Sequence, residues 1–405
     1  MKSRILMAVG SFLCLSLWAP AQTWESARRM TYSTRDSVDS DIAANGTKVY
    51  VLWAEDDPVS GYRDLFYRLS TNAGATWSTA KKLTFQQFVF SPAAIAASSS
   101  TVHIVCVQQG KLVYRKSTDN GGTWSKKWIY SNSHVGEPVE MGVNGNTIQV
   151  VFRAESETWP YGFLYNKRST DNGVTWSAAK PLVPVSYNVR TSCSLAVSGK
   201  YVHVACVSDI LHLNHLDMYY LRSTDYGATW KAPLQVASVG QPPVKVMDDS
   251  PYPTSDPSII ASGAYVHLFY ACMGSYQYWT DELFYMRSTD YGLSWSPGAP
   301  ITNEIQGYFC GLSAKAAAVS GSKVSVAYCG ILEDYPWDPY IGGVVFKKST
   351  DGGLSWEWPE LVIPNEDQDL TPSMVYVPAT GYFHLAFDGW VDDYHQNEVF
   401  YIRGK

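Results

Sequence analysis

Short hydrophobic runs with alternating polar positions recur along most of the chain and are separated by turn residues. An apolar run is followed by a turn such as Asn-Gly or Ser-Gly, and a second apolar run ends in an aromatic residue or a cysteine. A third run reads LFYR, LVYR, MYYLR or LFYMR, and a short fourth segment follows the next turn. Runs of this kind, bounded by Gly and Asn, are typical of antiparallel β-strands. The pattern predicts an all-β protein made of a repeated four-stranded unit.

One eight-residue phrase joins the third and fourth strands of the repeated unit. Its six copies are STNAGATW, STDNGGTW, STDNGVTW, STDYGATW, STDYGLSW and STDGGLSW, which begin at Ser70, Ser117, Ser169, Ser223, Ser288 and Ser349. They recur every roughly 50 to 65 residues, which is the length of a four-stranded propeller blade. The Ser and Asp side chains can bond backbone N–H groups in a tight loop, and the Gly can take a positive φ.

The phrase resembles the Asp-box, or bacterial neuraminidase repeat, S-x-D-x-G-x-T/S-W. Five copies match in full, and only Asn72 departs, since it replaces the Asp of the first box. The resemblance covers nearly the whole chain after its first twenty or so residues and implies a β-propeller of the sialidase-like superfamily. It also implies that each box lies at the outer edge of its blade, away from the ligand face. We therefore expect the boxes to be scaffold.

The two ends of the chain are expected to build one blade together. The final segment VFYIRGK reaches Lys405 where a box would begin, and TWESARRMT from Thr23 matches TWSTAKKLT from Thr76. With Trp24 as the Trp of this shared blade, the count is a seven-bladed β-propeller of four-stranded blades, closed by the N-terminal strand; a six-bladed sialidase-type propeller is the alternative. Residues 23–31 should then pair with residues 398–403, which removes open sheet edges.

The first residues have the features of a secretory signal peptide. Lys2 and Arg4 precede an apolar run from Ile5 to Trp18, and small residues follow at positions 19–21. This run is too short to span a membrane. We expect a signal peptide over residues 1–21, a single propeller domain over residues 22–405, and a secreted or periplasmic protein without a membrane span.

Composition narrows the classes of partner. The net charge is −6 and the cations are dispersed, which argues against nucleic acid. No CxxC or Cys/His spacing suggests a metal, so we expect no metal and no cofactor. Cys193 and Cys206 flank a Ser-Gly turn at equal distances, which places them opposite each other on adjacent strands. Aromatic residues make up 14% of the chain, and many fall in loops where they could stack on sugar rings. We expect a monomer that binds a glycan or polysaccharide.

The ligand face is expected where one blade connects to the next and where the second strand connects to the third. At the end of the second strands only blades three and seven carry a charge, Arg153 and Asp388. Arg190 could face Arg153 from the next blade, and paired guanidinium groups suit a carboxylate. The alternative is that Arg153 simply pairs with Glu155 or Glu140.

Further polar residues are predicted at the same face. Asp39, Glu137 and Asp256 lie near the starts of inner strands, and His212 and His215 fall in a loop where an imidazole could act as acid or base. The candidate catalytic residues are His212, His215, Tyr187, Asp256 and Asp388. The candidate substrate-binding residues are Arg153, Arg190, Arg35, Trp159 and Trp390.

The resemblance to sialidases is incomplete where their activity resides. The segment STRDSVDSD has Arg35 but lacks the Ile-Pro that follows this arginine in sialidases, and those enzymes have six blades. Related seven-bladed propellers include other glycoside hydrolases and uronate-cleaving polysaccharide lyases. The sequence therefore favours an exported glycan-active propeller, a hydrolase or lyase acting on an acidic saccharide. A noncatalytic carbohydrate- or protein-binding propeller is the alternative, and a true exo-sialidase is a minor one.

Overall fold

A computed structural model describes most of the chain after the predicted signal peptide. The described residues are 23–33, 35–56, 62–84, 89–132, 134–155, 162–183, 188–209, 217–238, 257–275, 280–302, 308–331, 342–365, 370, 372–390 and 396–405. Within them every regular element is a β-strand. No helix in this part of the chain is long and apolar enough to cross a membrane.

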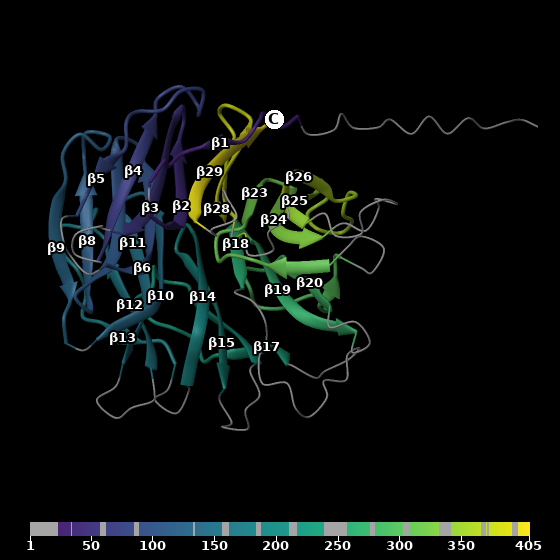
Figure 1. Cartoon of the computed structure of the whole chain (residues 1–405). Coiled ribbons are helices and arrows are strands. Elements are labelled where there is room, and N and C mark those ends of the chain that lie inside the picture. The colour runs from purple at the N-terminus through teal and green to yellow at the C-terminus, as the bar shows by residue number, and fades with distance from the viewer. Residues whose placement is uncertain are drawn as a thin grey trace, which may run out of the picture.

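The strands form seven antiparallel blades arranged in a ring, as the repeat predicts, and blades five and six are continuous through β22, which pairs with a strand of each (Figure 1). Blade one consists of β2(Ser37–Asn45), β3(Lys48–Asp56), β4(Arg63–Ser70) and β5(Lys81–Lys82). Blade two consists of β6(Val89–Ser98), β7(Thr101–Gln108), β8(Lys111–Ser117) and β9(Ser125–Tyr130). Blade three consists of β10(Val135–Asn144), β11(Thr147–Glu155), β12(Gly162–Ser169) and β13(Lys180–Pro181). Blade four consists of β14(Asn188–Ser198), β15(Tyr201–Asp209), β16(Asp217–Ser223) and β17(Leu234–Ser238). Blade five consists of β18(Ser258–Ser262), β19(Tyr265–Ser275), β20(Thr280–Ser288) and β21(Ala299–Pro300). Blade six contains β22(Tyr308–Gly311), β23(Ala317–Ser320), β24(Lys323–Ile331), β25(Gly342–Ser349) and β26(Glu360–Asn365), and blade seven contains β27(Ser373–Val377), β28(Tyr382–Trp390), β29(Asn397–Gly404) and β1(Arg28–Arg29).

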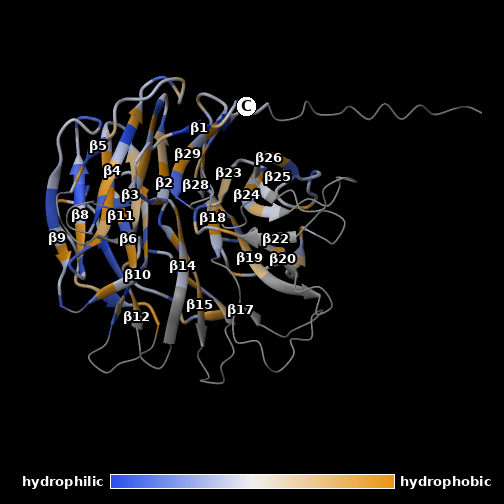
Figure 2. Cartoon of the chain, viewed as in Figure 1, coloured by the Kyte–Doolittle hydropathy of each residue, from blue (hydrophilic) through white to orange (hydrophobic). Residues whose placement is uncertain are grey.

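The core lies between neighbouring blades. Each blade presents apolar side chains of its inner and middle strands to the next one, and Figure 2 shows hydrophobic residues recurring along these strands. Leu52 and Ile104, for example, are fully buried in one cluster that joins blades one and two. Cys193 and Cys206 face each other across β14 and β15, as predicted. The alternation of apolar residues therefore fixes both the strands and the faces by which blades stack.

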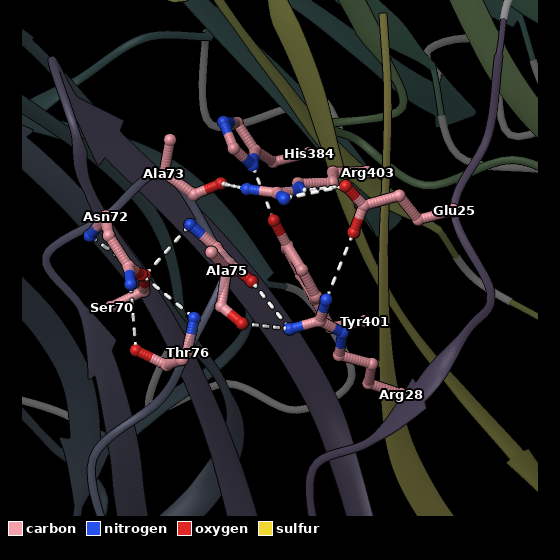
Figure 3. A network of polar contacts seen from close by, with 11 residues as sticks. Glu25, Arg28, Ser70, Asn72, Ala73, Ala75, Thr76, His384, Tyr401 and Arg403 are labelled. Atoms are coloured by element: carbon pink, nitrogen blue, oxygen red, sulfur yellow. Dashed lines mark hydrogen bonds and ion pairs between the residues drawn. The ribbon is translucent and has the colours of Figure 1, made fainter.

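The ring is closed by the two chain ends, which confirms the predicted pairing. Arg28 lies opposite Tyr401 and Arg29 lies opposite Phe400 as β1 pairs with β29. Trp24 forms a further bridge to Gly404. Figure 3 shows how polar contacts extend this seam to blade one, because Arg403 and Arg28 share Glu25 and both donate to carbonyls of the first box.

Inside each box, serine and aspartate close the loop by hydrogen bonds. In the third box Ser169 Oγ accepts from Gly173 N at 2.8 Å and donates to Asp171 Oδ1 at 2.7 Å, and the carboxylate also accepts from the backbone and hydroxyl of Thr175 at 2.8 and 2.5 Å. The bonds from Thr175 and Ser169 lower the pKa of Asp171 to about 2. In the first box Asn72 replaces the aspartate and keeps the corresponding hydrogen bonds, since its Oδ1 accepts from Ser70 Oγ and Thr76 N, both at 2.9 Å.

Each box also packs against the preceding blade. Trp176 packs edge-on against Tyr114 of blade two, with ring centroids 5.0 Å apart, and a Cβ added at Gly173 would lie 2.2 Å from Tyr114 Oη. Glycine is therefore required there for close approach as well as for its φ of 81°. Tyr114 Oη in turn contacts Nδ1 of the buried His103 at 2.7 Å. Corresponding His–Tyr pairs are His203–Tyr220, His267–Tyr285 and His384–Tyr401.

Replacing the box serine is expected to cost stability and to leave ligand binding intact. Ser169 is 1% exposed, and Ser169→Ala removes an acceptor for Gly173 N and a donor to Asp171, so we expect a loss of about 1 to 3 kcal/mol in the free energy of unfolding. Urea denaturation measures this loss. Val174→Ser in the same loop is the control, because Val174 is 60% exposed and its replacement should change stability by less than about 0.5 kcal/mol. Equal effects of both variants would contradict the role of the serine.

Candidate functional site

The predicted ligand face is the end of the propeller at which the inner strands begin. In each of the six boxes one backbone N–H bonds the turn between the first and second strands of the same blade, for example Ala73 N to Thr47 O at 2.7 Å and Asn172 N to Asn146 O at 2.8 Å. The boxes therefore lie at the end where the inner strands finish. The starts of these strands lie at the opposite end, as the sequence resemblance implied.

A cavity of about 210 Å³ lies on the ring axis towards the ligand face. Its wall includes Asp41 of blade one, Ala94 of blade two, Glu140 of blade three, Lys315 of blade six and Ser373 of blade seven. A cavity that is lined by residues of five of the seven blades must lie near the centre of the ring. The predicted residues Asp39 and Glu137 also line it, so the cavity is rich in carboxylates.

A short segment of blade six lies at the axis and forms part of this cavity. Residues 312–316 connect β22 to β23, and the carbonyl of Ala314 accepts from Ser194 of blade four at 2.7 Å and from Ser258 of blade five at 3.3 Å. From the same segment Ser313 Oγ donates to Pro372 O of blade seven at 2.6 Å. We call residues 312–316 the axial segment. It holds the centres of blades four to seven together and makes one side of the cavity.

Asp41 and Lys315 form the polar hub of the cavity. Lys315 Nζ donates to Asp41 across the axis, and the Asp41 carboxylate also accepts from Ser373 Oγ at 2.9 Å and Ile95 N at 2.8 Å. Burial opposes the charge of Lys315, but attraction by Asp41 and Glu140 outweighs it and raises the pKa of the ammonium. The lysine therefore stays charged, and Asp41 ties blades one, two, six and seven together.

Asp388 lies on β28 beside the start of β2. Its carboxylate accepts from Asp39 N at 2.5 Å and Ser40 N at 3.2 Å, where Asp39 has a φ of 58° and β2 is bulged. Burial, with a smaller contribution from the charge of Asp39, raises the pKa of Asp388 to about 7. The charge that was anomalous in the sequence thus holds the backbone of the neighbouring blade, directly behind the cavity residue Asp39.

Arg153 lies at the mouth of blade three and keeps its guanidinium unpaired among the described residues. It is opposite Gly136 in the β10–β11 ladder, next to the cavity residue Glu137. Its Nε is buried without a hydrogen-bond partner, and within the part of the chain that the structure describes it forms no ion pair with Glu155 or Glu140. Among the described residues, no carboxylate therefore competes with a ligand for this guanidinium.

The other predicted site residues are placed only in part. Arg35 is exposed in the segment before β2, where its carbonyl accepts from Gln396 Nε2 at 3.3 Å. Arg190 and Trp390 belong to β14 and β28, but only their backbone is described. Tyr187, His212, His215, Asp256 and Trp159 lie outside the described residues.

Several cavity residues were missed in the sequence analysis. Glu140 is a charged residue inside an apolar stretch of β10, and Lys315 is the charged residue among the small residues of the axial segment, so both were usable signals; Asp41 follows other polar residues at the start of β2. Arg63 lies 3.5 Å from Asp39 and 3.0 Å from Asp56, and it connects the rim of blade one to the cavity. Among the described residues no group of three His, Cys, Asp or Glu side chains could hold a metal ion.

Comparisons with known proteins agree with this architecture. A family model described as "BNR repeat-like domain" matches residues 18–210. No curated protein matches the sequence.

Solved structures show similarity in fold. A polysaccharide lyase of family PL25, an ulvan lyase bound to -[GlcA(1-4)Rha3S]-, has a TM-score of 0.57 at 10% identity and covers 92% of this chain and 95% of its own. A protein of unknown function from Dyadobacter fermentans has a TM-score of 0.51 at 14% identity and covers 96% and 100%. YCF48 bound to D1 peptide has a TM-score of 0.51 at 12% identity and covers 94% and 96%. At such identities the similarity concerns the fold alone. The protein is a seven-bladed β-propeller that carries Asp-box, or BNR, repeats, and its N-terminal part is similar to the BNR repeat-like family.

Proposed function

We propose that the protein is an exported glycan-active propeller that binds an acidic saccharide across its ligand face and cleaves it there. The observation that carries the proposal is the axial cavity lined by Asp39 and Glu137, with the guanidinium of Arg153 beside it, which forms no ion pair with any residue that the structure describes. Binding residues placed on loops above a rigid scaffold are typical of such propellers. The ulvan lyase supports the proposal only as an example of this fold holding a glucuronate-containing saccharide.

Carboxylates at the cavity favour hydrolysis. Glycoside hydrolysis needs two carboxyl groups, one to protonate the leaving oxygen and one to act as base or nucleophile. Asp39 and Glu137 come from blades one and three and line the same cavity, so they are the proposed pair. The cavity volume of about 210 Å³ is below the roughly 300–1,000 Å³ of a typical ligand pocket, so it would admit one sugar unit while the chain lies across the face.

The acidic group of the saccharide would bind Arg153. A half-buried guanidinium with no ion-pair partner in the described part of the chain gains a charge-assisted, two-pronged contact when a carboxylate approaches. Arg190, Tyr187, His212, His215 and Asp256 remain proposed contributors from the loops around the same face, and Trp159 and Trp390 remain proposed stacking surfaces. Lyase chemistry at these histidines and Tyr187 is the second candidate, because a guanidinium also neutralises the uronate that a lyase must deprotonate.

Loss of Arg153 is expected to weaken acidic ligands selectively. Arg153→Ala should lower affinity for an acidic oligosaccharide by about 2 to 4 kcal/mol, or about 30- to 1,000-fold, and affect a neutral one far less. Calorimetric titration measures both, with Lys231→Ala, an exposed cation at the opposite end, as control. Thermal stability should stay unchanged, since the arginine makes no ion pair among the described residues. Destabilisation without selective loss of acidic ligands would refute this role.

The type of reaction is tested by its products. Incubation with acidic polysaccharides should release reducing ends without ultraviolet-absorbing unsaturated uronates if the protein is a hydrolase, and with them if it is a lyase. Glu137→Gln should lower turnover by about 10² to 10⁴-fold while ligand binding persists. Binding without any product would identify a noncatalytic propeller and overturn the proposed cleavage.

A further inference from the structure

A second cavity, of about 270 Å³, lies between blades six and seven at the end of the propeller that carries the boxes. It is lined by the turn before β24, the end of β25 and the hairpin that joins β27 to β28. In the other six junctions, the box of the following blade occupies this position. Blade seven has no box loop between β29 and β1 in the described chain, because β1 comes from the N-terminal side. The cavity is therefore the place of a missing seventh box.

The cations next to each box position have a constant role in the other blades. In these blades a Lys or Arg stands just before the box serine. Its side chain reaches the box of the following blade and donates a hydrogen bond to the carbonyl of the residue that precedes the glycine of that box. Lys116 donates to Asn172 O at 2.8 Å, Arg222 to Tyr291 O at 2.9 Å, and Arg287 to Gly352 O at 2.9 Å. In blade one, Lys48 instead reaches Asn120 Oδ1 at 2.7 Å. A following box thus always supplies an oxygen acceptor to such a cation.

Blade six keeps these cations but has no box to receive them. Lys348 precedes the box serine Ser349, as Arg222 and Arg287 precede theirs, and Lys323 holds the strand position of Lys48. Both line the cavity together with Lys405. The His–Tyr pair is also replaced here, by Ser325 and Phe346, and Phe346 packs against Trp24 at 5.2 Å. The missing imidazole enlarges the space, and Ser325, 3% exposed, lines it.

We propose that this cavity binds a single acidic sugar residue, whose carboxylate or sulfate takes the place of the absent box oxygens between Lys348 and Lys323. Three lysines line the cavity, and Glu357 is the one acidic side chain among the described residues that line it. Tyr376 and Phe383, with ring centroids 4.6 Å apart, form an apolar wall on which a pyranose ring can lie. The site is on the face opposite the axial cavity and does not depend on the proposed cleavage.

Glu357 gives the proposal a test of opposite sign. It lies 3.4 Å from Lys348 Nζ and is 39% exposed, so the pair is a weak surface ion pair that an incoming carboxylate can replace. Removing this competing charge should strengthen binding. A merely structural role of the lysines would not produce such a gain.

The test is calorimetric titration of the protein with glucuronate, with glucose and inorganic sulfate as comparison ligands. Glucuronate should bind more tightly than glucose, which has no charge, and than sulfate, which has no ring. Lys348→Gln and Lys323→Gln should each weaken glucuronate at least tenfold, whereas Glu357→Gln should tighten it severalfold. Lys200→Gln, an exposed lysine of blade four, is the control and should leave affinity unchanged.

Arg153→Ala separates the two sites, since it should leave this binding intact even if the ligand-face proposal fails. Thermal melts of each variant identify any that is misfolded, and Glu357→Gln keeps the test informative because its predicted effect is a gain. Absence of glucuronate binding, equal binding of sulfate, or indifference to Lys348 and Glu357 would overturn the inference.

Discussion

Deletion of residues 23–31 is expected to prevent stable folding of the propeller. These residues supply the outer strand of blade seven, and they bury Met30 in the core between blades one and seven. Loss of the Met30 side chain alone should cost about 2 to 5 kcal/mol. It would also leave Glu398, which is fully buried, without Arg29 and Thr31, at a further cost of about 3 to 5 kcal/mol. The sum approaches the whole stability of a typical domain.

Thermal melting followed by circular dichroism measures this effect, and point variants assign its cause. Arg29→Ala should destabilise by about 3 to 5 kcal/mol because the 2.5 Å contact to the buried Glu398 is lost. Adding Glu398→Gln to Arg29→Ala should recover part of this loss, since no unpaired charge then remains in the core. A deletion variant that melts like the intact protein would contradict the closure of the ring by both chain ends.

Acidification is expected to unfold the protein steeply between about pH 6 and pH 4. Burial, followed by a neighbouring cation in each case, lowers the pKa of His103, His267 and His384 to about 4 and that of His203 to about 3. In the unfolded chain these imidazoles titrate near 6.5. Between the two values the unfolded state binds more protons than the native state, so stability falls as pH falls. Four such groups give a slope of up to about 5 kcal/mol per pH unit.

Asp388 opposes this trend but cannot cancel it. Its pKa is raised in the folded state, so the native protein holds one extra proton between about pH 7 and pH 4 and is stabilised as pH falls through that range. One carboxyl acts against four imidazoles. The carboxylates of the boxes, such as Asp171 with a pKa near 2, lose their contribution only at lower pH.

Urea unfolding at a series of pH values measures the slope, and blade three suggests the matched variant. There Gln149 and Asn166 replace the His–Tyr pair, and Asn166 Nδ2 donates to Gln149 Oε1 at 3.0 Å. The double variant His203→Gln with Tyr220→Asn should therefore reduce the slope by about one proton, whereas His134→Gln, at an exposed position, should not. A free energy of unfolding that is constant from pH 6.5 to pH 4.5 would show that the buried histidines do not control acid stability.

The sequence by itself determined the fold because its signals are local and repeated. Turn residues, alternation and the Ser-Asp-Gly-Trp spacing of the box act within one blade, so six copies predict six loops of the same geometry. The segment at Thr23 matches the fourth-strand segment at Thr76, and a fourth strand needs a third strand to pair with. The segment at the end of the chain has the sequence of a third strand without a fourth, so the match predicted one blade shared by both chain ends. The positions of Asp39 and Glu137 followed in the same way from their place at the start of inner strands.

Only the tertiary structure decided which charges meet. Lys315 reaches Asp41 from 274 residues away, and Asp388 holds the backbone of Asp39 from a distance of 349 residues in sequence. Such contacts depend on the angle through which each blade turns and on where the ring closes, which no local pattern encodes. The same reason hid the cavity at Lys348. A missing box is visible in the sequence, but the space it leaves exists only once blades six and seven are stacked beside each other.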